Sequence, residues 1–391
     1  MSRQPLIPRQ NDVFMKLAHQ VSSTIAKEHN LVFSPLSLHV VLSLIAAGSS
    51  GVTLDELLEF LKSETIDDLN KLSSIIASNV VADGSSLGGP ELQFANGVWV
   101  SMDLPLKPSF VDVVHGVYKA VVKNVDFVNQ ARKVTSEVNS WAENHTKGLI
   151  KEVLPKHVIT VETKLILANA LYFKGSWDIK FDATKTKSFD FHLLNGDSIQ
   201  VPFMRSYEKQ FVRSFGDFKV LRLLYKQGKD INRQFSMYVF LPNEIDGLPS
   251  LMEKFSSQPG FLEEHLPSDK KVLMWDFKLP KFKISFGFEA TDVLKSLGVE
   301  HPFIPGGLTE MLVDPFTSDE LYVSNIFQKS FIEVNEEGTE AAAVTVANLV
   351  IPTSCSNMPQ TFVADHPFMF MIREDISGVV LFIGHVMDPS S

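Results

Sequence analysis

Apolar residues near the start of the chain recur at helical spacing. Four of them fall on one stripe, which predicts an amphipathic helix near the N-terminus: Phe14, Leu17, Val21 and Ile25. Ser34 followed by Pro35 is typical of a helix N-cap with proline at the first helical position. The apolar face that begins there continues to Gly48, so we expect a second helix between these residues.

Two further helices are marked by their boundary residues. Thr53-Leu54-Asp55-Glu56 has the spacing of a capping box, in which the first and last side chains cap the helix reciprocally. It predicts a helix start at this point. Val134, Val138 and Trp141 also lie at helical spacing, and Gly148 is a suitable C-terminal stop.

Strand-like segments follow, mostly in the second half of the chain. They are rich in β-branched and aromatic residues, and several are apolar throughout, which is typical of strands covered on both faces. The predicted strands cover residues 165–173, 235–242, 277–286, 321–334, 368–372 and 378–386. Helices that precede strands without βαβ alternation indicate an α+β fold. No linker rich in Pro, Gly or Ser divides the chain, so we expect one large domain over residues 1–391.

Composition narrows the classes of partner. The 391 residues are 45% apolar, which is enough for a large core, and the net charge is −10. The basic residues are scattered, which argues against nucleic-acid binding, and no apolar run reaches the roughly 18 residues of a membrane span. The N-terminal segment has no apolar signal-peptide core. We therefore expect a cytoplasmic or nucleocytoplasmic protein, and release from the cell stays compatible with the sequence.

Few residues offer conventional catalytic chemistry. Gly84-Ser85-Ser86-Leu87-Gly88 matches the nucleophile-elbow pattern of hydrolases, but that pattern needs a strand before it and a helix after it. Its surroundings favour a flexible Gly/Ser loop. Cys355, the single cysteine, lies in a serine- and proline-rich segment that is typical of an exposed loop. The eleven histidines show no metal-ligand spacing, so we expect no metal, no cofactor and no enzyme.

The segment NEEGTEAAAVTVA, residues 335–347, is the most informative part of the sequence. As a strand, it would place only small uncharged side chains on one face: Thr339, Ala341, Ala343, Thr345 and Ala347. That face could enter a crowded sheet without a clash. The acidic residues before Gly338 and the polar segment 352–361 favour a solvated loop instead. The sequence thus permits an exposed loop or an inserted central strand, and an ordinary edge strand followed by a long loop is a third possibility.

Long motifs in this chain resemble those of the serpins, a family of serine-protease inhibitors, and of plant serpins in particular. They appear in order along nearly the whole chain. FIEVNEEGTEAAA (331–343) is similar to the family's hinge, and Asn30 with FSPLS (33–37) is similar to the entry of its helix B. The other motifs are LANALYFKGSWDIKF (167–181), LPKFKI (279–284), FVADHPF (362–368) and LFIGHVMDP (381–389).

The resemblance implies a serpin fold with three β-sheets, eight to nine helices and a mobile reactive-centre loop over residues 336–361. It also implies irreversible suicide-substrate inhibition: a protease cuts the loop, forms an acyl-enzyme, and is trapped when the freed hinge inserts as a new strand of the main sheet. The residues that correspond to this hinge are Glu336, Glu337, Gly338, Thr339, Glu340, Ala341, Ala342 and Ala343.

By the same resemblance, two further groups of residues control the opening of the sheet. The family's breach tryptophan corresponds to Trp177, and its shutter corresponds to Ser34, Ser37 and Asn169. The family usually has histidine in the shutter where this chain has Gln328. Glutamine can both donate and accept, so a hydrogen-bond network can persist there with a different geometry.

The family's hinge length, counted from Gly338, puts the reactive bond at Pro352–Thr353. Thr353–Ser354 is a rival, which would suit elastase-like or subtilisin-like proteases. Ile351 would suit a papain-like cysteine protease that reads an apolar second subsite. No Arg or Lys lies between residues 338 and 372, so trypsin-like targets are disfavoured.

Inhibition of serine proteases, and of papain-like cysteine proteases, by a monomer is therefore the predicted function. A serpin-fold protein that binds or regulates without inhibiting is the alternative, because proline is a poor specificity residue for most serine proteases. A hydrolase that uses Ser86 or Cys355 is a second alternative, although neither residue has an assignable base. No nucleic-acid or membrane partner is expected.

Overall fold

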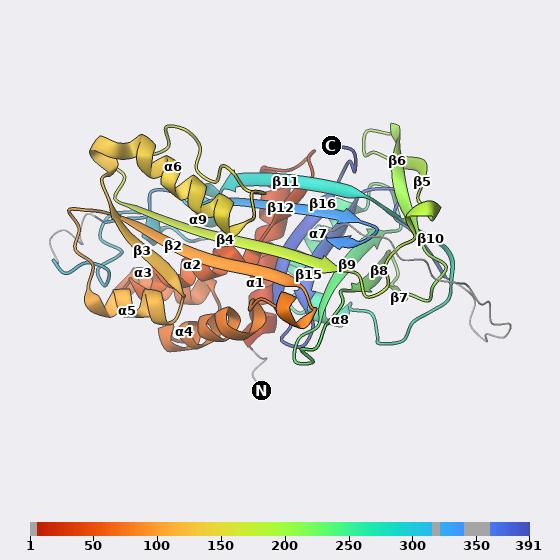
Figure 1. The fold of residues 1–391 in the computed structure, drawn as a ribbon, viewed down its shortest axis with the longest axis horizontal. Helices are drawn as coiled ribbons and strands as arrows, with labels where there is room; N and C mark the ends of the chain where they lie inside the picture. Colours follow the sequence, from red (N-terminus) through yellow and green to blue (C-terminus); the bar gives the residue numbers. More distant parts are fainter. Residues whose placement is uncertain (1–5, 315–320, 340–359) are drawn as a thin grey trace.

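The computed structural model describes residues 6–314, 321–339 and 360–391. Within these ranges the chain forms an α+β fold on three β-sheets, which confirms the predicted fold class (Figure 1). One of the two six-stranded sheets, called the large sheet below, has the spatial order β11-β12-β13-β4-β2-β3. These strands are β11 (Phe282–Glu289), β12 (Phe327–Asn335), β13 (Gly338–Thr339), β4 (Leu165–Ser176), β2 (Glu91–Ser101) and β3 (Ala120–Val125).

Two further sheets complete the framework. The second six-stranded sheet has the order β1 (Leu31–Phe33), β16 (Val380–Val386), β15 (Phe368–Glu374), β9 (Phe235–Pro242), β8 (Phe218–Leu224) and β7 (Phe211–Ser214). The four-stranded sheet has the order β14 (Gln360–Val363), β10 (Met274–Pro280), β6 (Ser198–Arg205) and β5 (Lys187–His192).

Nine α-helices are present in the described ranges, which agrees with the predicted eight to nine. They are α1 (Leu6–Thr24), α2 (Pro35–Ala47), α3 (Gly51–Phe60), α4 (Ile66–Ile75), α5 (Pro108–Gly116), α6 (Phe127–His145), α7 (Leu248–Ser257), α8 (Phe261–Glu264) and α9 (Thr291–Ser296). Short 3-10 turns cover Ser85–Leu87, Ala183–Lys185 and His301–Phe303, and a π-helical turn covers Ile76–Val80.

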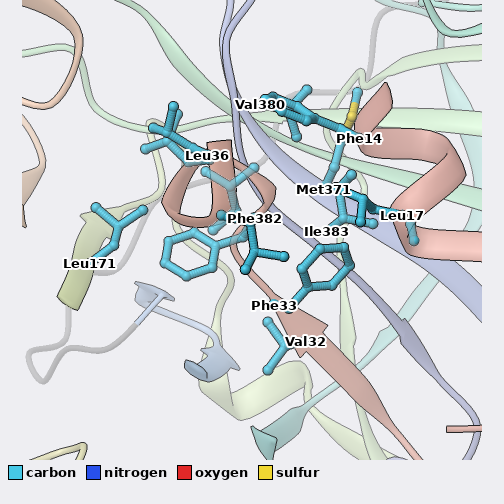
Figure 2. Packing of buried hydrophobic residues seen from close by; sticks show 14 of the residues in the cluster. Phe14, Leu17, Val32, Phe33, Leu36, Leu171, Met371, Val380, Phe382 and Ile383 are labelled. Atoms are coloured by element: carbon cyan, nitrogen blue, oxygen red, sulfur yellow. The ribbon is translucent and has the colours of Figure 1, made fainter. Parts of the chain in front are cut away.

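The apolar helix α2 lies between the two six-stranded sheets. All its residues from Pro35 to Ala46 are buried, and it contacts both β4 and β16. Figure 2 shows Leu36 of α2 among apolar side chains that include Leu171 of β4 and Phe382 of β16. A predominantly apolar helix fits this position, because it is buried on every side.

The strand β4 separates two apolar clusters because its side chains alternate in direction. Leu165, Leu167, Leu171 and Phe173 belong to the main core around α2. Ile166, Ala168 and Ala170 point to the opposite face and pack in a second cluster with residues of α6. The helix α6 therefore covers the outer face of the large sheet (Figure 1).

The predicted boundaries of α2 and the predicted apolar stripe of α6 are confirmed. The Ser34 side chain accepts a hydrogen bond from the Ser37 N–H at 3.1 Å, and α2 begins at Pro35. Val134, Val138 and Trp141 are buried in the second cluster. These helices follow from local signals because their caps and apolar faces are contiguous in the sequence.

The predicted start of the next helix is wrong. α3 begins at Gly51, so Thr53 lies inside the helix instead of capping it. The carboxylate of Glu56 accepts hydrogen bonds from the backbone N–H groups of Glu300 and His301, at 2.7 and 2.9 Å. The Glu56 side chain, which a capping box would use, is therefore bound to His301, some 245 residues away in the chain.

Two predicted strands also differ from the structure. Segment 277–286 is not one strand: β10 ends at Pro280, β11 begins at Phe282, and the two belong to different sheets. Proline has no N–H to continue a ladder, so Pro280 is a natural end for β10. Segment 321–334 enters the sheet only at Phe327.

Candidate functional site

The large sheet contains one strand of only two residues. β13, formed by Gly338 and Thr339, lies between β12 and β4 and pairs antiparallel with both. Its partners are Val334 and Asn335 of β12 and Gly175 and Ser176 of β4. Beyond these partners, no ladder joins β12 directly to β4 in the described part of the chain. We call the space between the facing edges of β12 (327–333) and β4 (165–174) the slot.

A narrow cleft extends from β13 along the slot. Thr339 lies at one end of the cleft, and its walls are residues 171–173 of β4 and 331–333 of β12. Thr146, Leu149 and Ile150, which follow α6, cover it from outside. Most of these side chains are apolar, so a strand that entered the cleft would bury apolar surface.

Gly338 is required at the head of the slot. Its φ angle is +152°, and a Cβ added there would lie 2.0 Å from the carbonyl oxygen of Gly175. Real Cβ atoms do not approach backbone that closely. Only glycine therefore allows the chain to enter the sheet between β12 and β4 at this point.

Thr339 is held by an aromatic pair. Its side chain is buried and hydrogen bonds to the Tyr225 hydroxyl at 2.6 Å. Trp177 stacks on the Tyr225 ring with a centroid distance of 4.7 Å. Burial raises the pKa of Tyr225 well above its ordinary value, so the hydroxyl stays protonated and can donate. Gly175 makes room for this ring, because a Cβ there would lie 2.6 Å from a Tyr225 ring carbon.

Glu336 and Glu337 are anchored by backbone hydrogen bonds. Their carbonyl oxygens accept from the N–H groups of Phe181 and Trp177, at 3.0 and 2.9 Å. The Trp177 indole also donates to the Asn335 carbonyl oxygen at 2.9 Å. The tryptophan that sequence analysis assigned to the breach thus holds the chain just before β13.

The two glutamate side chains form ion pairs. Glu336 pairs with Lys281 at 2.9 Å and accepts from the Thr186 hydroxyl at 2.7 Å, and Glu337 pairs with Lys180 at 2.5 Å. Burial alone would raise the pKa of Glu336, but the hydrogen bonds from Lys281 and Thr186 outweigh it and lower the pKa below its ordinary value. Glu336 is therefore ionised at neutral pH.

These contacts correct the prediction that Glu336, Glu337 and Gly338 belong to a solvated loop. Glu336 is only 9% exposed, and Gly338 and Thr339 are paired on both sides. The reason is long-range: the groups that bind this segment come from β4, Tyr225, Thr186 and Lys281, none of which is near it in the sequence.

At the other end of the slot, the predicted shutter residues form two separate pairs. The Gln328 side-chain amide donates to the Ser34 carbonyl oxygen at 2.6 Å, next to the Ser34–Ser37 cap. Asn169 instead donates to the Asn96 side chain at 2.6 Å. One buried acceptor on each strand has no partner among the described residues: Gln328 Oε1 on β12 and Asn169 Oδ1 on β4.

Several predicted site residues lie outside the described residues. They are Glu340, Ala341, Ala342 and Ala343 of the hinge, Pro352, Thr353 and Ser354 of the candidate reactive bonds, and Cys355. Ser86 is described, and it lies in an exposed 3-10 turn instead of a strand-to-helix elbow. This turn is closed by hydrogen bonds, including Gly84 N–H to the Pro90 carbonyl oxygen, so it is ordered instead of a flexible loop.

Some residues of the site carry no local sequence signal. Tyr225 lies 114 positions from Thr339, and Asn96 lies 73 positions from Asn169. Lys281 falls within the motif 279–284, but nothing in that motif links it to Glu336. Such pairs are visible only when the strands are placed beside one another.

The described residues form neither a metal site nor a membrane span. No group of three or more His, Cys, Asp or Glu side chains there could hold a metal ion. None of the described helices has both the length and the apolar character to cross a bilayer.

The fold and the site together define an α+β protein with three sheets. Among the described residues, the slot in its large sheet holds only the two-residue strand β13. This chain belongs to the serpin family: the family model for "Serpin (serine protease inhibitor)" matches residues 8–389. Serpin-ZX of Arabidopsis thaliana is 51% identical over 385 residues, which cover 98% of each chain. Serpin-ZXA of Oryza sativa subsp. japonica is 51% identical over 389 residues, which cover 98% of this chain and 97% of that one.

Solved structures agree with this assignment. AtSerpin1 of Arabidopsis in its native stressed conformation superposes with a TM-score of 0.92 at 49% identity, and each chain is covered completely. The cleaved serpin 42Da superposes with a TM-score of 0.81 at 28% identity, over 98% of each chain. Membership of the family and similarity to plant serpins support a role as a protease inhibitor.

Proposed function

We propose that this protein traps a target protease by inserting the residues that follow Thr339 into the slot after the protease has cut them. The observation that carries the proposal is β13. Its two residues already pair with β12 and β4, while no other strand of the described residues lies between these two strands. An inserted strand would need only to continue this pairing, and it would satisfy a row of backbone donors and acceptors.

The register of β13 predicts where each inserted residue would lie. Thr339 is opposite Val334 and Gly175. Six residues further along an inserted strand, position 345 would lie opposite Gln328 of β12 and Asn169 of β4, which are six residues back along their own strands. Because side chains alternate with period two, Thr345 would face the core as Thr339 does.

The chemistry of the slot supports this register. Gln328 Oε1 and Asn169 Oδ1 are buried acceptors without a partner among the described residues, and a threonine hydroxyl can donate one hydrogen bond. Insertion would therefore bring a donor to the place where acceptors are unsatisfied. In the same register, Ala341 would lie opposite Ile332 and Phe173, where a small side chain avoids a clash.

The proposed targets are serine proteases that accept a small or proline residue at the primary site, and papain-like cysteine proteases. The proposed reactive bond is Pro352–Thr353, with Thr353–Ser354 as its rival. We propose that the protein acts as a monomer, is not itself an enzyme, and works in the cytoplasm or nucleocytoplasm.

The test uses the full chain with subtilisin, elastase and papain as probes. Complexes that survive boiling in detergent support trapping, and mass spectrometry of the released C-terminal fragment locates the cut. Thr345→Val should raise the number of inhibitor molecules consumed per protease trapped, whereas Thr345→Ser, which keeps the hydroxyl, should not. If a cut near residue 352 traps no protease and leaves the melting temperature unchanged, the alternative of a non-inhibitory binding or regulatory protein replaces this proposal.

A further inference from the structure

The four-stranded sheet carries a highly exposed tryptophan. Trp275 of β10 is 76% exposed. β10 pairs in parallel with β14, and the register shifts between Met274, which is opposite Gln360, and Asp276, which is opposite Thr361. Trp275 is the additional residue of this irregularity, and a β-bulge of this kind changes the direction of a side chain. The bulge explains why the Trp275 side chain is exposed although Met274 and Asp276, on either side of it, are paired with β14.

The Trp275 side chain makes no ring stacking, cation–π contact or hydrogen bond with any other described residue. Its neighbour Asp276, in contrast, pairs with Lys278 at 2.7 Å. The other three tryptophans are buried, with exposures of 0%, 8% and 2%: Trp99, Trp141 and Trp177. A large aromatic side chain that stays in water forgoes the free energy of burial, and exposed tryptophans of this kind are enriched among the hot spots of protein interfaces.

The position of Trp275 indicates the partner. Exposure alone would not single it out, because Ile231 is 77% exposed. Trp275 differs because it lies beside Gln360, the first residue of β14, which follows the candidate reactive bonds closely in the sequence. Ser354 is six residues before Gln360, which is at most about 22 Å of extended chain. A protease of at least about 30 Å in diameter that binds there can therefore reach the surface beside Gln360.

We propose that Trp275 is a protease-contacting residue outside the reactive bond, and that it increases the rate at which the target is captured. This inference rests on the proposed function. It concerns the encounter between the two proteins, whereas the slot concerns the step after cleavage. The two can therefore be measured separately.

The first experiment compares capture rates. Trp275→Ala should lower the second-order rate constant of complex formation by at least about tenfold, as expected for loss of a hot spot. Trp275→Phe should lower it less. The number of inhibitor molecules consumed per protease trapped should stay at the value of the unaltered protein, because insertion is untouched.

Met102 provides a matched control. It is 65% exposed and follows β2, where its N–H donates to Val125. The end of the large sheet near Met102 is marked by Leu165 of β4, which pairs with Val100. The opposite end is marked by Ser176 of β4, which pairs with Gly338. The two ends are about 36 Å apart along β4. Met102→Ala should leave the capture rate unchanged.

The second experiment observes Trp275 directly. Because the other three tryptophans are buried, iodide should quench mainly Trp275 fluorescence in the free protein. Addition of subtilisin whose nucleophile is replaced by alanine should reduce that quenching, and Trp275→Phe supplies the background signal. Each variant is first checked for an unchanged melting temperature.

The outcomes separate the two proposals. If the unaltered protein traps a protease but Trp275→Ala does so at the same rate, the role of Trp275 is refuted and the trapping mechanism stands. If the unaltered protein traps no protease, the proposed function fails, and quenching with the inactive enzyme still reports whether Trp275 meets a protease. Quenching that is unchanged on binding also refutes the contact.

Discussion

The two ends of the slot differ in how completely their polar groups are paired. At the end formed by β13, the carboxylates of Glu336 and Glu337 are in ion pairs. Thr339 is paired with β12 through its backbone and hydrogen bonds to the Tyr225 hydroxyl through its side chain. At the other end, Gln328 and Asn169 each retain a buried acceptor without a partner among the described residues. The closed end fixes where a new strand would begin, and the open end is where that strand would gain most.

This difference has an energetic consequence. A buried acceptor without a partner costs about 1–3 kcal/mol, and the open end has two of them among the described residues. The open end therefore raises the free energy of the uncut protein, while the closed end stabilises it. Loss of a contact at the closed end should destabilise the uncut protein, whereas removal of the unpartnered Gln328 acceptor at the open end should not. Gly338→Ala and Gln328→Met test this contrast directly, and changes at His39 and Asn169 measure the contribution of other buried polar groups of the core.

The largest effect is expected at Gly338. Gly338→Ala would force a Cβ to within 2.0 Å of the Gly175 carbonyl oxygen in a backbone region that side chains rarely adopt. We expect a loss of about 3 kcal/mol in the free energy of unfolding, measured by urea denaturation. Gly196→Ala is the control, because Gly196 also has a positive φ (+89°) but open space around it. If both variants lose the same stability, the close approach at Gly338 has no energetic weight.

The second effect is a pH dependence from the core beneath the sheet. His39 of α2 is fully buried, and burial lowers its pKa to about 4. The unfolded chain therefore binds a proton that the folded protein does not bind between about pH 6.5 and 4. Stability should fall by about 3 kcal/mol as the pH is lowered across that window.

Thermal or urea unfolding at several pH values measures this slope, and His39→Gln should flatten it whatever its stability at pH 7. His385, which is also buried with a pKa near 4, should supply the slope that remains in that variant. The closed end behaves differently, because the pKa of Glu336 is lowered from an already acidic value. Its ion pair should persist until the pH falls through that lowered pKa. A His39→Gln protein with an unchanged slope would contradict the assignment.

Local features of the fold were predictable from the sequence, and long-range pairing was not. The Ser34–Pro35 cap and the stripe of Val134, Val138 and Trp141 were predicted correctly because their information is contiguous. The start of α3 was mispredicted because Glu56 has a distant partner at His301. The segment around Gly338 was recognised by its small residues and its family motif.

The anchoring of Glu336 and Thr339 in the sheet was missed for the same reason. Lys281 and Tyr225 become their neighbours only after the strands assemble. Segment 277–286 is a further example of a long-range feature that the sequence does not predict. Its pattern is that of one continuous strand, but the chain changes from one sheet to another at Pro280. Periodicity describes which face of a strand is buried, but it does not say which sheet the strand joins.

A smaller effect is expected at Asn169. Asn169→Leu removes the amide that donates to Asn96 Oδ1 at 2.6 Å and leaves that oxygen buried without a donor. Asn96 itself still donates to the Tyr118 carbonyl oxygen at 2.7 Å, so the Asn96 side chain loses one of its two hydrogen bonds and keeps the other. We expect a loss of about 1–2 kcal/mol in urea denaturation. The double variant Asn96→Ala/Asn169→Leu should lose less than the sum of the single changes, and strict additivity would show that the two residues do not interact.

The smallest effect is expected at Gln328, where the change should be slightly stabilising. Gln328→Met keeps the length of the side chain and removes both the bond to the Ser34 carbonyl oxygen and the unpartnered Oε1. The Ser34 carbonyl oxygen keeps a second donor, the Leu38 N–H at 3.4 Å, so it is not orphaned. The uncut protein should therefore be equal in stability or gain up to about 1 kcal/mol. The cut protein should gain less on insertion, because one acceptor for Thr345 is gone, and the rise in melting temperature after cleavage should shrink. A Gln328→Met protein that is strongly destabilised before cleavage would show that the open end of the slot is already satisfied, and the contrast between the two ends would be lost.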